Sequence, residues 1–112
     1  MRRKLSKKDR AQCIWLLREA KKILKTENVF MVCGALYRVN EKYHADEKLH
    51  QNWMYLNRWI YKNLEGCISY SHWLRIKHPK LLAVPQSILI EQLLIARFAW
   101  VDWMINELEA GK

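Results

Sequence analysis

The amino-acid sequence predicts an all-α protein, a small bundle of four to five helices with a long C-terminal helix. The 112 residues include only 3 glycines and 2 prolines, which leaves few of the residues that tight turns between strands require. Apolar side chains instead recur at helical spacing along most of the chain. The length is that of one ordinary domain, and a composition of 51% hydrophobic and 28% charged residues is typical of a globular chain.

The first predicted helix begins at about Lys7 and is both basic and amphipathic. Ser6 followed by Asp9 has the spacing of a capping box, so residues 1–6 form a basic N-terminal tail and residues 7–112 a single helical domain. Apolar side chains fall on one arc of this helix and most cations on the opposite arc. The apolar arc holds Cys13, Leu16, Leu17, Ala20, Ile23 and Leu24. The opposite arc holds Lys7, Arg10, Arg18, Lys21, Lys22 and Lys25, with Ile14 projecting among them and Trp15 beside them.

The middle of the chain predicts three shorter helices. The apolar run Val29–Val39 is interpreted as a buried second helix; its first residues also favour a strand, but a single strand would have no partner. A third helix begins at Asp46, follows an apolar stripe and ends at Gly66, and a short fourth helix covers about Tyr70–Lys77. The stripe of the third helix consists of Leu49, Trp53, Leu56, Ile60 and Leu64.

The last predicted helix covers about Pro85–Glu109, with Gly111 as its terminator. Its apolar stretch Ile88–Ile105 approaches the length of a membrane span. We expect no span, because charged side chains inside a bilayer are costly, and Arg97 and Asp102 are better placed in polar contacts inside the bundle or at its edge. The helix is apolar around most of its circumference, which favours a central position in the bundle or the seam of a homodimer.

The positive charge is concentrated in the first helix. Residues 1–25 contain ten lysines and arginines against Asp9 and Glu19, so they carry +8 of the formal net charge of +9. Such a basic face is suited to bind phosphates or acidic side chains, with Trp15 available for stacking. The alternative is a solvated face that only keeps a tryptophan-rich chain soluble. A membrane surface is disfavoured, because Cys13 and Ala20 are small and the apolar arc is needed for the core. The candidate binding residues are Arg3, Lys7, Arg10, Ile14, Trp15, Arg18, Lys21, Lys22 and Lys25.

The sequence contains no recognisable catalytic or metal-binding constellation, so we expect neither an enzyme nor a cofactor. Cys67, His72 and His78 give three candidate metal ligands without a fourth at a recognised spacing. Cys67 and His72 also lack a third group that would orient a nucleophile pair. The odd number of cysteines, 3, and the lack of an apolar stretch after the basic start indicate reduced thiols and a cytoplasmic protein.

Four short motifs carry a resemblance to a known group of proteins. They are Phe30-x-x-Cys33-x-Ala35-Leu36, Leu64-Glu65-Gly66, Ser69-Tyr70-x-x-Trp73-Leu74 and Arg97-x-x-Trp100-x-Asp102-x-x-Ile105. Together they resemble small proteins encoded by bacteriophages, in which a cysteine-containing helix precedes a Ser/Thr-x-x-x-Trp-Leu turn and a final Arg-x-x-Trp-Leu-Asp helix. The likeness covers residues 30–105, without the basic first helix, and Val101 stands where that group often has leucine. It implies an accessory role in an infected bacterium and, because the group has no established activity, assigns no residue roles.

The sequence therefore favours a non-enzymatic bacteriophage accessory protein in the cytoplasm of its bacterial host. We expect it to bind a host protein or nucleoprotein complex that has an acidic surface and acts on nucleic acid, and to inhibit or redirect it. The contacts expected are the basic first helix and exposed side chains such as Met54, Trp59 and Tyr61. The alternative is direct, sequence-nonspecific binding of DNA or RNA, although the helix Tyr70–Lys77 is short for reading bases in a groove.

Overall fold

The computed structural model describes residues 5–27, 29, 31–43, 45–62 and 86–111, which form four α-helices and no strand. The helices are α1 (Lys7–Thr26), α2 (Val32–Lys42), α3 (Glu47–Tyr61) and α6 (Gln86–Glu109). The predicted all-α class and the long final helix are confirmed. The predicted fourth helix, at about Tyr70–Lys77, lies outside the described residues, as do Cys67, His72 and His78.

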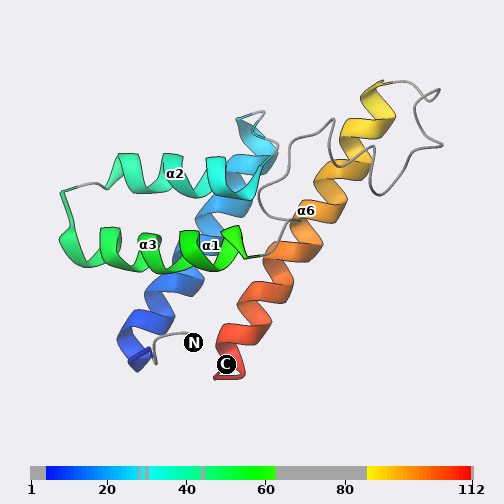
Figure 1. The fold of residues 1–112 in the computed structure, drawn as a ribbon. Helices are drawn as coiled ribbons and strands as arrows, with labels where there is room; N and C mark the ends of the chain where they lie inside the picture. The colour runs from blue at the N-terminus through cyan, green and yellow to red at the C-terminus, as the bar shows by residue number, and fades with distance from the viewer. Residues whose placement is uncertain (1–4, 28, 30, 44, 63–85, 112) are drawn as a thin grey trace.

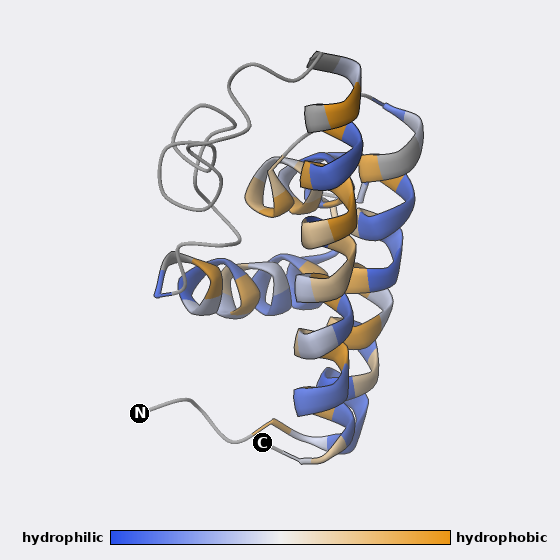
Figure 2. Cartoon of the chain, turned by 90° about the vertical axis from the view of Figure 1, so that its right-hand side faces the viewer, coloured by the Kyte–Doolittle hydropathy of each residue, from blue (hydrophilic) through white to orange (hydrophobic). Residues whose placement is uncertain are grey.

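Two pairs of helices make up the described bundle. α6 runs alongside α1 in the opposite direction, and α2 and α3 lie side by side across α1 (Figure 1). The view turned by 90° again shows the two long helices next to each other (Figure 2). Because α1 packs against each of the other three helices, it is the central helix of the described residues, a position that the sequence suggested for the last helix.

The ends and the core face of α1 agree with the sequence. Ser6 is the N-cap, and its hydroxyl oxygen accepts a hydrogen bond from the backbone N–H of Asp9 at 3.1 Å. All six residues of the apolar arc are buried, from 0% exposed for Cys13 to 4% for Ile23. The helical period therefore predicted the buried side of α1 correctly.

α2 begins and ends later than predicted. Met31, its N-cap, has an extended backbone and makes no side-chain hydrogen bond to the helix, so the apolar run begins as an extended connection. Val29 stays outside the helix but packs back on it, since a methyl group added to Gly34 would lie 3.3 Å from Val29 Cγ1. At the other end Asn40 is only 7% exposed, and its Oδ1 lies 3.2 Å from Nδ1 of His50 in α3. The helix thus continues through polar residues that the sequence assigned to a connection.

α3 begins as predicted but ends early. Asp46 is the N-cap, and its Oδ1 accepts a hydrogen bond from the backbone N–H of Leu49 at 3.1 Å. The helix ends at Tyr61, so the predicted stop at Gly66 was about one turn too late. Apolar spacing marks the residues that face the core, not the last helical hydrogen bond. Trp59 is only 7% exposed and belongs to the core, so its expected role as an exposed aromatic was wrong.

α6 ends at Glu109 and is followed by Gly111, as predicted. Gly111 has a φ of 82°, in the left-handed region that favours glycine after a helix. Within the helix, Arg97 is 0% exposed, in agreement with the expected place of this side chain inside the bundle. None of the described helices is both long enough and apolar enough to cross a membrane.

Candidate partner-binding surface

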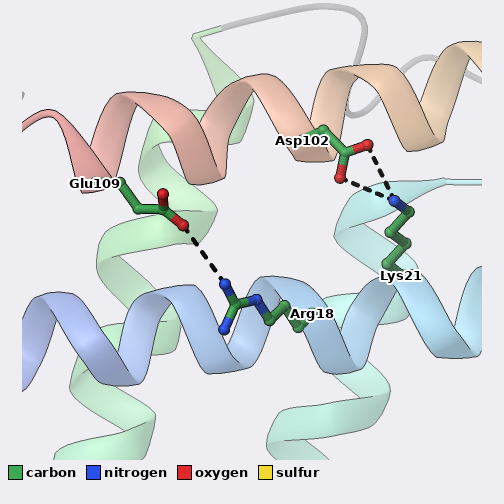
Figure 3. A network of polar contacts seen from close by, with 4 residues as sticks. All are labelled: Arg18, Lys21, Asp102 and Glu109. Atoms are coloured by element: carbon green, nitrogen blue, oxygen red, sulfur yellow. Dashed lines mark hydrogen bonds and ion pairs between the residues drawn. The ribbon is translucent and has the colours of Figure 1, made fainter.

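The basic arc of α1 is divided by its packing against α6. Lys21 Nζ lies 2.9 Å from Oδ1 and 3.0 Å from Oδ2 of Asp102. About one turn nearer the N-terminus, Arg18 Nη2 lies 3.5 Å from Oε1 of Glu109 (Figure 3). Carboxylates of α6 therefore neutralise part of the face that the sequence predicted to meet a partner.

The two apolar residues that interrupt the basic arc have structural contacts. Ile14 precedes Arg18 by one turn, so it lies on the side of α1 that faces α6, and it packs partly buried against the core. Trp15 is also partly buried against the core, and its ring meets Tyr43 edge-on with centroids 5.3 Å apart. Tyr43 is 44% exposed, which makes it the aromatic side chain that this part of the surface presents.

The cations that α1 presents to solvent lie along its outer side. Lys7 and Lys8 are exposed in the first turn, and the side chains of Arg18 and Lys22 are 62% and 74% exposed. Lys22 Nζ pairs with Oε2 of Glu19 in the same helix at 2.8 Å. Exposed ion pairs of this kind contribute only about 0–1 kcal/mol, so acidic groups of a partner can replace them. We call Lys7, Lys8, Arg18 and Lys22 the basic edge of α1.

The remaining candidate residues lie elsewhere or are not described. Arg10 is partly buried where α1 meets the end of α6, because a Cβ added to Gly111 would lie 3.1 Å from Nη1 of Arg10. Its buried Nε has no hydrogen-bond partner among the described residues. Arg10 is therefore set apart from the basic edge. Arg3 lies outside the described residues, and the side chain of Lys25 in α1 is not described.

An open groove of about 430 Å³ lies between α1 and α6, next to the C-terminal half of the basic edge. Three cations of α1 form one wall, and a carboxylate, an apolar side chain and an amide of α6 form the other. These lining residues are Arg18, Lys21, Lys22, Asp102, Ile105 and Asn106. Cations and an apolar side chain thus occur together in one hollow that the sequence did not predict.

A second charged hollow, on α2, is internally paired. Arg38 Nη1 lies 3.0 Å from Oε1 of Glu27, and Lys42 Nζ lies 3.6 Å from the other oxygen of the same carboxylate. The hydrogen bond from Arg38 lowers the pKa of Glu27, and although desolvation opposes it, the pKa remains below its ordinary value. One carboxylate between two cations indicates a structural tie between the end of α1 and α2.

Sequence reasoning missed several exposed apolar side chains. Tyr37 in α2 is 53% exposed, and its ring lies near that of Trp53 with centroids 6.4 Å apart. Trp103 in α6 is 43% exposed and contacts Trp59 with centroids 6.0 Å apart. Met54 is 36% exposed, as expected, whereas the side chain of Tyr61 is not described. The sequence could have indicated the exposure of Tyr37, because this residue lies outside the buried stripe of α2.

A polar network joins the first turns of α1 to α3. Asn52 is fully buried, and its Nδ2 donates to Oε1 of Gln12 at 2.6 Å and to Oδ1 of Asp9 at 3.3 Å. Lys48 Nζ lies 3.2 Å from the other oxygen of Asp9. Desolvation raises the pKa of Asp9, but hydrogen bonds from Asn52, from Ser6 and from Lys48 outweigh it and leave the pKa below its ordinary value. This network orients α1 and with it the basic edge.

Possible metal ligands are not clustered among the described residues. No group of three or more histidine, cysteine, aspartate or glutamate side chains among them is placed to hold a metal ion. Comparison of the chain with known protein families, with curated proteins and with solved structures finds no significant match.

Proposed function

We propose that this chain is a non-enzymatic bacteriophage accessory protein that acts in the cytoplasm of an infected bacterium. It binds a host complex that acts on nucleic acid, and it inhibits or redirects that complex by occupying an acidic surface. The basic edge of α1 supports this proposal. Its four cations are exposed on one side of a helix whose opposite side is buried in the core.

Two further features of the surface support a partner protein. α1 packs against three other helices, so the cations of its basic edge start from a fixed backbone, which lowers the entropic cost of binding. Tyr43 is exposed beside Trp15, and tyrosine and tryptophan are enriched at the centres of protein interfaces. Exposed cations beside an exposed tyrosine fit a partner surface of opposite charge.

The test is affinity capture of the tagged full chain from bacterial lysate, with and without nuclease, followed by mass spectrometry. We expect a host protein in stoichiometric amount that survives the nuclease. At least one of two double variants of the basic edge, Lys7→Glu with Lys8→Glu or Arg18→Glu with Lys22→Glu, should lose it. Arg58→Glu with Lys62→Glu, the same change in charge on exposed residues of the α3 end, should retain it. Recovery of nucleic acid alone, lost on digestion, would contradict the proposal.

Direct binding of DNA or RNA is the second candidate. It is favoured by two exposed lysines in the first turn of α1, Lys7 and Lys8, which follow a tail containing three more cations. If the four cations of the basic edge each neutralise one phosphate, log K should fall with log salt at a slope of about −3.6. A fluorescence titration with a labelled oligonucleotide at several salt concentrations measures this slope, and a flat response would remove this candidate.

A further inference from the structure

The groove between α1 and α6 is about one helical turn long on each wall. Arg18 and Lys22 stand one turn apart on α1, as Asp102 and Asn106 do on α6. Ile105, 8% exposed, forms an apolar floor between them. The hollow is therefore matched by three side chains of a partner, two acidic ones for the cations and an apolar one for the floor.

The charges around the groove are nearly balanced. Asp102 is part of the lining, and Glu109 and Glu19 lie close by through their ion pairs with Arg18 and Lys22. A nucleic-acid strand places a phosphate every few ångströms and would bring some of them against these carboxylates. Discrete carboxylates spaced by a protein segment can meet the cations and avoid the acids. Charge complementarity thus favours an acidic protein segment over a phosphate backbone.

The two ion pairs between α1 and α6 differ in how readily a carboxylate of a partner could replace the carboxylate of α6. Lys21 meets both oxygens of Asp102 at 2.9 and 3.0 Å, and its side chain is only 31% exposed. Arg18 meets a single oxygen of Glu109 at 3.5 Å, with both side chains more than half exposed. Lys21 is therefore held in the structure, and Arg18 is the cation that a partner carboxylate can take from α6.

We propose that this groove is the docking site for a segment of the partner protein that presents acidic side chains next to an apolar one. The acidic groups bind Arg18 and Lys22, and the apolar side chain covers Ile105. Glu109 then acts as an internal competitor that the partner displaces from Arg18. The inference rests on the proposed function and names the chemistry of its partner.

The probe is a fluorescein-labelled helical peptide with glutamate at positions i and i+4 and leucine at i+3. Its controls are the same peptide with glutamine in place of each glutamate, and a labelled oligothymidylate. Binding to the full chain is measured by anisotropy, and the site by shifts of the Asn106 side-chain amide in NMR spectra. We expect the acidic peptide to bind and shift that amide, and the glutamine peptide to bind at least about tenfold more weakly.

Variants place the binding on the groove. Arg18→Glu with Lys22→Glu should weaken peptide binding by about tenfold or more, whereas Lys7→Glu with Lys8→Glu, the same change in charge at the other end of the basic edge, should not. Glu109→Gln should strengthen binding about two- to fivefold by releasing Arg18, a gain that misfolding cannot produce, and Glu91→Gln is its matched control on α6.

Three results would overturn the docking site. The first is that the acidic peptide does not bind. The second is that Lys7→Glu with Lys8→Glu weakens peptide binding as much as Arg18→Glu with Lys22→Glu does. The third is that the oligothymidylate binds more tightly than the acidic peptide and shifts the side-chain amide of Asn106. The lysate capture separates this failure from that of the proposed function. A host protein that survives nuclease and is released by Lys7→Glu with Lys8→Glu, but not by Arg18→Glu with Lys22→Glu, supports the function and rejects the groove.

Discussion

Asn52 is a fully buried polar residue that joins α3 to α1. Its amide donates to Gln12 and to Asp9, so Asn52→Leu would keep the number and branching of the heavy atoms and leave both acceptors without that donor. We expect the free energy of unfolding to fall by about 1–3 kcal/mol, measured by urea denaturation followed by circular dichroism. Gln51→Ala, a change at the exposed neighbour, should stay within about 0.5 kcal/mol of the wild type. Equal stability of Asn52→Leu and the wild type would show that the network contributes nothing.

Asp9 links the stability of the same network to acid pH. Although desolvation raises its pKa, hydrogen bonds from Asn52 and Lys48 contribute to a net value below the ordinary 3.8. A carboxyl whose pKa is lowered by folding stabilises the fold fully above its unfolded pKa, and this contribution is lost as pH falls through the folded pKa. The wild type should therefore lose stability from about pH 5 downward, and Asp9→Asn should lose less over that range. Urea denaturation at a series of pH values tests this, and parallel curves for the two proteins would contradict it.

For single residues, the sequence predicted which side chains of α1 are buried but not which carboxylates its cations pair with. Cys13, Leu16 and Leu17 are buried as expected, because the helical period alone decides which side of α1 can meet a core. The partners of the cations were not predictable, because Arg18–Glu109 and Lys21–Asp102 join residues 91 and 81 positions apart. Such pairs depend on how α6 lies against α1, which local spacing does not encode.

The N-cap of α1 should contribute to the stability of the whole helix. Ser6 accepts the backbone N–H of Asp9, one of the donors that a helix start leaves without an internal partner. Ser6→Ala should destabilise the protein by about 1 kcal/mol, whereas Ser6→Thr, which keeps an accepting hydroxyl, should retain most of the stability. Thermal unfolding measures the loss, and faster amide exchange in the first turn of α1 would locate it. A Ser6→Ala protein as stable as Ser6→Thr would rule out a contribution of this cap.

Helix ends were predicted where a capping residue marks them. Ser6 caps α1 as expected, and Asp46, which was expected to begin α3, is its N-cap. Serine and aspartate both accept backbone N–H groups of the first turn. α2 has no such signal, since its N-cap is Met31, and its start was placed too early. Its end was placed too early as well, because Asn40 is polar in the sequence but buried against His50 in the fold.

For the whole molecule, the fold class followed from composition and period, while the arrangement did not. α6 is apolar around most of its circumference, so its sequence did not reveal which side meets α1. In the structure Leu93, Val101 and Met104 face the core, and Ile88, Ile95 and Trp103 remain 46%, 53% and 43% exposed. The residue types on the two sides are alike, and only the packing of α6 in the fold distinguishes them.

The exposed apolar side of α6 predicts self-association of the chain. Ile88 and Ile95 lie two turns apart on one side of the helix, where Ala99 allows close approach of a second copy. Each copy carries a formal net charge of +9, so two copies repel each other at low salt. The sedimentation coefficient of the wild type should therefore rise with protein concentration, and more strongly at higher salt, which screens the repulsion. Ile95→Glu should abolish the rise, and Gln92→Glu, the same added charge one turn away, should only reduce it. A wild-type coefficient that is independent of concentration would mean that this side of α6 does not bind a second copy.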